Sequence, residues 1–202
     1  PSRRPSATPE RTPDAALVAD VARRLGEALG DTLLNLGGGA ADQPALTIPR
    51  ASLPVAPARL AAAHPGGTSA RGRARERYER CLARYRGDVR PQDSALGIDD
   101  VGAVVAHFVA VNLEALQGVD VTPAVLLRLE RQLVGLVQLS PAWAGAGARE
   151  RQMYFEQLAI LTVYVAELSH QARAQGPDAV AHVRRAARGY LQTLRGPALA
   201  IL

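Results

Sequence analysis

The sequence contains no lysine, and all 24 of its basic residues are arginines. Together with the many Ala, Gly and Pro residues, this bias is what a GC-rich coding sequence produces. The number of arginines alone is therefore a weak indication of nucleic-acid binding. The net charge is only +5, because 19 acidic residues are interspersed with the basic ones. Such a charge favours acidic partners only mildly.

Cysteine is almost absent too, since Cys81 is the only one in the chain. One cysteine excludes an intrachain disulfide framework. A single thiol is compatible with the cytosol, and also with an exported protein if the thiol is buried. The cysteine content therefore leaves both compartments open.

The sequence also lacks a hydrophobic run long enough to span a membrane. Its most apolar stretch, residues 153–168, is interrupted by Glu156 and Gln157 and is too polar at its ends for a transmembrane helix. No signal peptide is visible either. Since the sequence begins at Pro1 rather than at Met, we expect that a leader segment has been removed.

Residues 153–168 are nevertheless the stretch around which the rest of the chain is organised. Their apolar side chains fall on nearly every side of a helix and do not fit on one stripe. A helix that is apolar all round is one that other elements surround. We therefore predict that this segment lies in the central helix of a soluble helical bundle.

The N-terminal part of the chain has a different character. Residues 1–13 are rich in Pro, Ser and Arg, which is typical of an extended arm. Residues 14–36 carry apolar side chains at helical spacing and predict an amphipathic helix. This helix either packs on the bundle or acts as a detachable helix that binds a partner. The candidate partner-binding residues are Val18, Val21, Leu25 and Leu29.

Residues 37–68 contain five prolines and show little periodicity. An irregular connection of this length is unusual inside a compact domain. We therefore interpret the range as a linker between the N-terminal helix and a main domain at residues 69–197. Residues 198–202 are left as a short C-terminal tail.

From residue 69 onward every segment has an apolar period of 3.6, and none alternates for long enough to form a strand. The sequence thus predicts an all-α fold, a bundle of about five helices. Asp99 or Asp100 and Gly118 are the expected caps of the second helix. The predicted helices cover about residues 69–86, 100–117, 123–139, 149–175 and 177–195, with a loop at 141–147.

The most prominent charged feature is an arginine-rich helix at residues 71–90. If it bound phosphates, each contact would steepen the salt dependence of binding by about 0.9 log units. However, Glu76 and Glu79 lie three or four positions from several of these arginines, which favours internal pairing and a solvated helix face. No nucleic-acid recognition motif accompanies the run. The candidate anion-binding residues are Arg71, Arg73, Arg75, Arg77, Arg80 and Arg84.

One pair of residues has the spacing of a metal site, namely Glu167 and His170, which read Glu-x-x-His. A carboxylate-bridged di-iron site needs two such pairs and two further glutamates, and the chain has no second pair. A polar pair near the end of its helix is the favoured interpretation. Cys81 lies on an apolar helix face without a nearby His, which indicates a core residue rather than a nucleophile. We therefore predict no catalytic residue, no metal and no cofactor.

Six segments between residues 57 and 195 carry a resemblance to a known family. They are PARLAAA at 57–63, LARYR at 82–86, LGIDDVGAVVAHFVAVNLEAL at 96–116, RQLVGLVQLSPAW at 131–143, YFEQLAIL at 154–161 and VRRAARGYLQTL at 183–194. In their pattern and order they resemble a family of bacterial exported proteins that is defined as a domain of unknown function. The resemblance implies an all-helical domain after a cleaved signal peptide, and it implies no catalytic residues.

The leading hypothesis is a non-enzymatic protein-binding or scaffolding protein of the bacterial envelope or exterior. Its ligand would be a protein partner or a second copy of the chain. The hypothesis depends on the lack of a catalytic constellation and on the arm and the amphipathic helix, which are suited to docking. The alternative is a binder of nucleic acid or of an anionic surface through residues 71–90. A third option is an enzyme with a metal at Glu167 and His170.

Overall fold

The computed structural model describes residues 47–48, 53–88, 97, 99–118, 120–138 and 141–194. The predicted arm at 1–13, the predicted amphipathic helix at 14–36 and the predicted tail at 198–202 lie outside these residues. The structural statements that follow concern the described residues alone.

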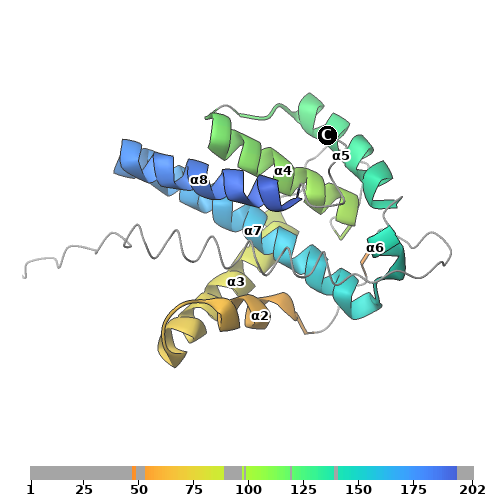
Figure 1. The fold of residues 1–202 in the computed structure, drawn as a ribbon, viewed down its shortest axis with the longest axis horizontal. Helices are drawn as coiled ribbons and strands as arrows, with labels where there is room; N and C mark the ends of the chain where they lie inside the picture. The colour runs from red at the N-terminus through yellow and green to blue at the C-terminus, as the bar shows by residue number, and fades with distance from the viewer. Residues whose placement is uncertain are drawn as a thin grey trace, which may run out of the picture.

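The described part of the chain is all-α, as the sequence predicted. It contains seven helices and no strand, apart from a single bridge between Thr47 and Asp100. Five long helices follow residue 67, together with one short helix where a loop was expected (Figure 1). The helices are α2 (Ala56–Ala63), α3 (Thr68–Asp88), α4 (Val101–Gln117), α5 (Pro123–Gln138), α6 (Pro141–Gly145), α7 (Ala148–Gln175) and α8 (Pro177–Leu194).

Helix α7 occupies the centre of the bundle, which confirms the prediction for residues 153–168. Every residue from Tyr154 to Val165 is buried. Helices α4 and α8 pack on one side of α7, and α3 and α2 pack on the other (Figure 1). Helix α5 packs against α4. A helix enclosed in this way has no free face, so its apolar residues need not form a stripe.

Helix α3 is held across α7 by its apolar face, on which Tyr78 and Tyr85 are both buried. The Tyr78 ring meets the edge of Tyr164 at a centroid distance of 6.2 Å, and the Tyr85 ring meets Phe155 in the same manner at 6.1 Å. Such edge-to-face pairs add to the free energy that burial of the rings supplies. These contacts fix which side of α3 faces solvent.

Both expected caps of α4 are confirmed. The carboxylate of Asp100 accepts a hydrogen bond from the backbone N–H of Ala103, at 3.1 Å, and thereby satisfies one N–H of the first turn. At the other end Gly118 has φ +76°, and its N–H donates to the carbonyl of Glu114 at 2.8 Å. A residue with a side chain rarely adopts this left-handed conformation, so glycine ends the helix here.

The structure differs from the expectation of a linker over residues 37–68. Residues 56–63 form α2, which packs against α3 and α7. Pro57 starts this helix instead of breaking the chain, because the first turn of a helix needs no N–H from the proline. Ile48 is also part of the core, and its N–H donates to the carbonyl of Asp99 at 2.8 Å.

A fully buried carboxylate, that of Glu156, ties α2 to α7. Its Oε2 accepts hydrogen bonds from the backbone N–H groups of Val55, at 2.8 Å, and Ala56, at 2.9 Å. Its Oε1 accepts from Nε2 of Gln152 at 2.8 Å and lies 4.0 Å from the guanidinium of Arg86. The first turn of α2 has no capping side chain of its own. Glu156 therefore supplies from another helix the cap that α2 lacks.

Replacing Glu156 by glutamine is expected to destabilise the protein by about 2–4 kcal/mol. The variant keeps the size of the side chain, but it removes the negative charge that faces the Arg86 guanidinium. It also turns an amide NH₂ toward groups that are themselves donors. Urea unfolding followed by circular dichroism measures the change. Glu150→Gln is the matched control, because exposed Glu150 accepts from only one N–H, that of Gly147. An equal loss in the two variants would contradict this role of Glu156.

Gly102 permits the close approach of α4 and α5. A Cβ atom at this position would overlap the side chain of Val134 and lie 3.2 Å from the Cα of Val134. A side chain at position 102 would therefore require Val134 to shift or the two helices to move apart. Gly72, inside α3, has open space around the same position.

Gly102→Ala should therefore lower the free energy of unfolding by about 1–3 kcal/mol, because the two helices must move apart. Gly72→Ala, the control, should raise it by about 0.5–1 kcal/mol, since alanine loses less backbone entropy in a helix. Chemical denaturation of both variants tests the opposite signs. A stabilising Gly102→Ala would rule out the tight contact.

Candidate functional site

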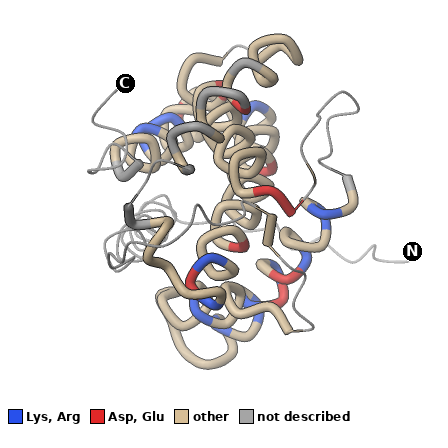
Figure 2. The backbone as a smooth tube through the Cα atoms, turned by 90° about the vertical axis from the view of Figure 1, so that its right-hand side faces the viewer, with Lys and Arg blue, Asp and Glu red and all other residues tan. Residues whose placement is uncertain are grey.

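The six candidate anion-binding arginines all lie on α3, and all six are exposed. They occupy the sides of the helix that its buried apolar face leaves to solvent. Two acidic positions, Glu76 and Glu79, are interspersed among the more numerous arginine positions of this helix, and Figure 2 marks the charged positions along the backbone. We call these residues the arginine face: Arg71, Arg73, Arg75, Arg77, Arg80 and Arg84. The next arginine along the helix, Arg86, is different, because it turns inward and pairs with Asp99 at 3.3 Å.

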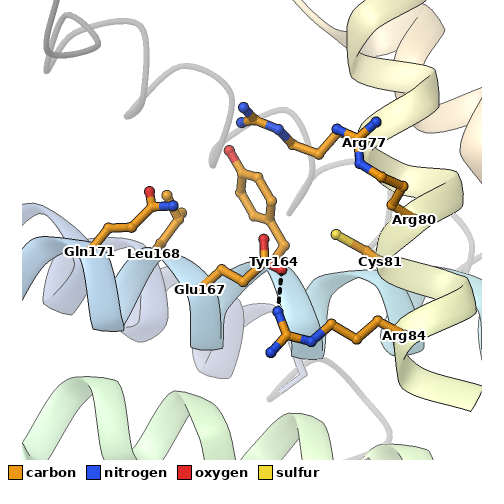
Figure 3. Close-up of a pocket in the computed structure, with 8 residues that line it drawn as sticks. All are labelled: Arg77, Arg80, Cys81, Arg84, Tyr164, Glu167, Leu168 and Gln171. Atoms are coloured by element: carbon orange, nitrogen blue, oxygen red, sulfur yellow. Dashed lines mark hydrogen bonds and ion pairs between the residues drawn. The ribbon is translucent and has the colours of Figure 1, made fainter. Parts of the chain in front are cut away.

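Half of the arginine face lines a groove between α3 and α7 (Figure 3). The groove has a volume of about 500 Å³. Arg77, Arg80 and Arg84 lie on its α3 side, at the spacing i, i+3 and i+7 that places residues on one helix face. The remaining lining residues are Cys81 of α3 and Tyr164, Glu167, Leu168 and Gln171 of α7. The structure therefore brings three of the six predicted residues together, and Arg71, Arg73 and Arg75 lie outside the groove.

Several guanidinium groups of the arginine face are engaged with neighbours in the chain. Arg75 pairs with Glu79 at 2.9 Å, as the spacing predicted. Arg84 pairs with Glu167 of α7 at 2.8 Å, across 83 positions of sequence. Both pairs are largely exposed, and exposed ion pairs contribute only about 0–1 kcal/mol. Such contacts can be exchanged for contacts with a ligand at little cost.

Cys81 lies in this groove beside three arginines, which is an arrangement that favours a reactive thiolate. Burial acts in the opposite direction and is the stronger effect. It raises the pKa of the Cys81 thiol to about 11, with a further contribution from the Glu167 carboxylate, while the arginines lower it only in part. The thiol is therefore protonated at neutral pH. Its burial among the core residues agrees with the interpretation of Cys81 as a core residue.

The Glu167–His170 pair is not arranged as a metal site. Glu167 points across to Arg84, whereas His170 is exposed on α7. Among the described residues, no group of three or more His, Cys, Asp or Glu side chains is placed to hold a metal ion. Glu167 thus belongs to the groove, a role that its spacing to His170 did not indicate.

A buried polar network joins α3, α4 and α5 at His107. The hydroxyl of Tyr85 and Nδ1 of His107 form a hydrogen bond at 2.8 Å, and Nε2 of His107 lies 3.5 Å from a carboxylate oxygen of Glu130. Burial lowers the pKa of His107 to about 4, so the ring is neutral at pH 7 and the contact with Glu130 is no ion pair. Sequence spacing gave no sign of this network, because its three members come from three helices.

The candidate partner-binding residues Val18, Val21, Leu25 and Leu29 lie outside the described residues. In the part of the chain that the structure describes, none of the helices combines the length and the apolarity that a membrane crossing requires.

His107 is expected to make folding stability depend on pH. Its pKa is about 4 in the folded protein and about 6.5 in the unfolded chain. Below pH 6.5 the unfolded chain binds a proton that the folded protein does not, so stability falls as the pH is lowered toward 4. The loss attributable to this group is about 3 kcal/mol.

Urea unfolding of the wild type and of His107→Gln across this pH range provides the measurement. The difference in unfolding free energy between them should shrink by the same amount from pH 7 to pH 4, since glutamine does not titrate. The control His170→Gln, at an exposed position, should follow the wild-type curve. A difference between wild type and His107→Gln that is independent of pH would contradict the assignment.

Comparison with known proteins adds one finding to this geometry. No curated protein and no solved structure matches the chain. A family match covers residues 2–197, so it includes the N-terminal region as well as the helical bundle. It confirms the resemblance to a family of unknown function that the segments between residues 57 and 195 indicated. The chain belongs to the family described as "Family of unknown function (DUF6683)".

Proposed function

We propose that the protein is a non-enzymatic binding protein whose arginine face docks on an acidic protein partner. The observation that carries this proposal is the exposure of all six arginines on one helix, three of them along a groove. Arginine is enriched where proteins recognise carboxylates, because its planar group offers several donors in a fixed geometry. The groove supplies a concave surface beside those donors.

The state of the nucleophilic and basic groups supports a binding role over catalysis. The Cys81 thiol is protonated at neutral pH and is almost fully buried. The neutral His107 ring is enclosed between Tyr85 and Glu130. A general base must reach the proton that it removes, and a nucleophile must reach the bond that it attacks. His107 lacks that access, and Cys81 borders the groove only as an almost fully buried, protonated thiol.

The charge pattern of α3 favours a protein partner over a nucleic acid. Glu76 and Glu79 are exposed among the arginines, and Glu79 is paired with Arg75. A phosphate backbone carries negative charge without interruption, so these carboxylates would repel it. A protein surface can present charges of both signs and match such a mixed pattern. An acidic segment with occasional basic residues is therefore the partner that fits best.

Two further parts of the proposal extend beyond the described residues. We propose that the predicted helix at 14–36 adds a second contact, to the same partner or to a second copy of the chain. We also propose that the protein acts in the bacterial periplasm or outside the cell, as the family resemblance implies. Burial of the single thiol is compatible with export, because a buried Cys is protected from oxidation. Fractionation of the source cells tests the location.

The binding proposal predicts that a fluorescent glutamate-rich peptide binds the full chain and that added salt weakens this binding. Replacing Arg73, Arg77 and Arg80 together by alanine should raise the Kd at least about tenfold, because three contacts on one helix face are lost. Fluorescence anisotropy over a salt series measures both effects. The matched control is the triple alanine variant at Arg184, Arg185 and Arg188, an exposed cluster on α8 with the same charge.

The outcomes separate the alternatives. Loss of binding in the α3 variant alone supports the proposal, whereas an equal loss in the two variants indicates attraction to net charge and contradicts it. Tighter binding of a DNA duplex with the same charge as the peptide would favour the nucleic-acid alternative instead. A peptide that does not bind at any salt concentration would refute the arginine face as a docking surface.

A further inference from the structure

We propose that Glu167 is a built-in occupant of a carboxylate site in the groove between α3 and α7. On docking, a carboxylate side chain of the acidic partner takes its place at Arg84. This inference rests on the proposed function above and names the position and the ligand chemistry of its site. It also makes the Arg84–Glu167 contact an intramolecular competitor of the partner.

The geometry of the groove supplies the first argument. Arg77, Arg80 and Arg84 line the groove along α3, and only one carboxylate, that of Glu167, faces them from α7 (Figure 3). Nη1 of Arg84 donates to Oε1 of Glu167 at 2.8 Å. Three guanidinium charges thus outnumber one carboxylate charge in the groove. The excess of positive charge attracts an additional carboxylate.

The exposure of the pair supplies the second argument. The side chains of Arg84 and Glu167 are 55% and 36% exposed, so water already solvates both groups. An incoming carboxylate can replace Glu167 without leaving a buried charge unpaired. Glu156 shows the contrast, because its side chain is 1% exposed and it caps a helix. A buried carboxylate of that kind is not exchangeable, since its removal leaves backbone N–H groups without acceptors.

The size and the lining of the groove indicate which carboxylate fits. A volume of about 500 Å³ far exceeds that of a single small anion, since a water molecule occupies about 30 Å³. Besides the charged groups the groove offers the apolar side chain of Leu168, the ring of Tyr164 and the amide of Gln171. An acidic side chain that belongs to a peptide segment can fill this space, with apolar neighbours along Leu168 and its backbone near Gln171.

If the partner's carboxylate displaces Glu167 from Arg84, removing the Glu167 carboxylate should strengthen binding of the acidic partner. Glu167→Gln should lower the Kd for the glutamate-rich peptide about fivefold, because the peptide no longer competes with an ion pair. Glu79→Gln is a closely matched control. It adds the same positive charge on the same face, but it removes the partner of Arg75, outside the groove. We expect it to lower the Kd by less than about twofold.

A second pair of variants separates displacement from simple repulsion between Glu167 and the peptide. In the Arg84→Gln background, Glu167→Gln should bring no gain, because the contested contact is absent. A gain that persists there would overturn the inference. Circular dichroism is expected to be unchanged in all variants, since the substituted side chains are solvated.

Failure of this inference is distinguishable from failure of the proposed function. Equal gains for Glu167→Gln and Glu79→Gln would show that Glu167 is no specific competitor, while the arginine face would still bind the peptide. No binding by the wild type or by any variant would refute the docking surface itself. Tighter binding of a phosphoserine peptide with the same charge would overturn the assignment to a carboxylate ligand.

Discussion

The enclosure of α7 is the constraint from which the rest of the structure follows. Because α7 is buried from Tyr154 to Val165, a charged group on this stretch needs partners that the protein itself supplies. The carboxylate of Glu156 finds the two N–H groups at the start of α2. A burial that would otherwise be costly is thus offset by hydrogen bonds that cap the start of α2.

The same enclosure positions the groove. Helix α3 must turn Tyr78 and Tyr85 toward α7, because these rings pack on Tyr164 and Phe155. With that side of the helix buried, the arginines between the aromatic residues lie on the remaining sides. Glu167 lies one turn beyond Tyr164 on α7, just past the fully buried stretch, where the helix emerges toward solvent and can meet Arg84. The charged groove therefore forms at the point where the enclosure of α7 ends.

Polar side chains have different roles in this molecule, and the role of each depends on how far the side chain is buried. Glu156 and Asp100 both accept hydrogen bonds from N–H groups at the start of a helix. Glu156 caps α2 from another helix, α7, whereas Asp100 caps α4 from the position just before that helix. His107 links three helices as a neutral ring, because burial opposes its protonation. Glu167, still solvated, holds an ion pair that is weak enough to exchange.

The sequence by itself determined the helical class, the central position of residues 153–168, the caps Asp100 and Gly118, and the exposure of the arginines on α3. Each of these depends on local spacing or on the chemistry of one turn, which a sequence displays directly. It also gave Cys81 as a core residue, because the residues around it define the apolar face of one helix.

Only the tertiary structure decided the rest. The sequence did not indicate the helix at 56–63, because the segment around it is rich in proline, and the cap of this helix comes from a carboxylate 100 positions away. The same holds for the pairing of Arg84 with Glu167, for the His107 network and for the contact at Gly102. In each case the partners come from different helices, and their meeting depends on how those helices cross. Periodicity along one chain segment carries information about the faces of its own helix, but none about the partner that each face will meet.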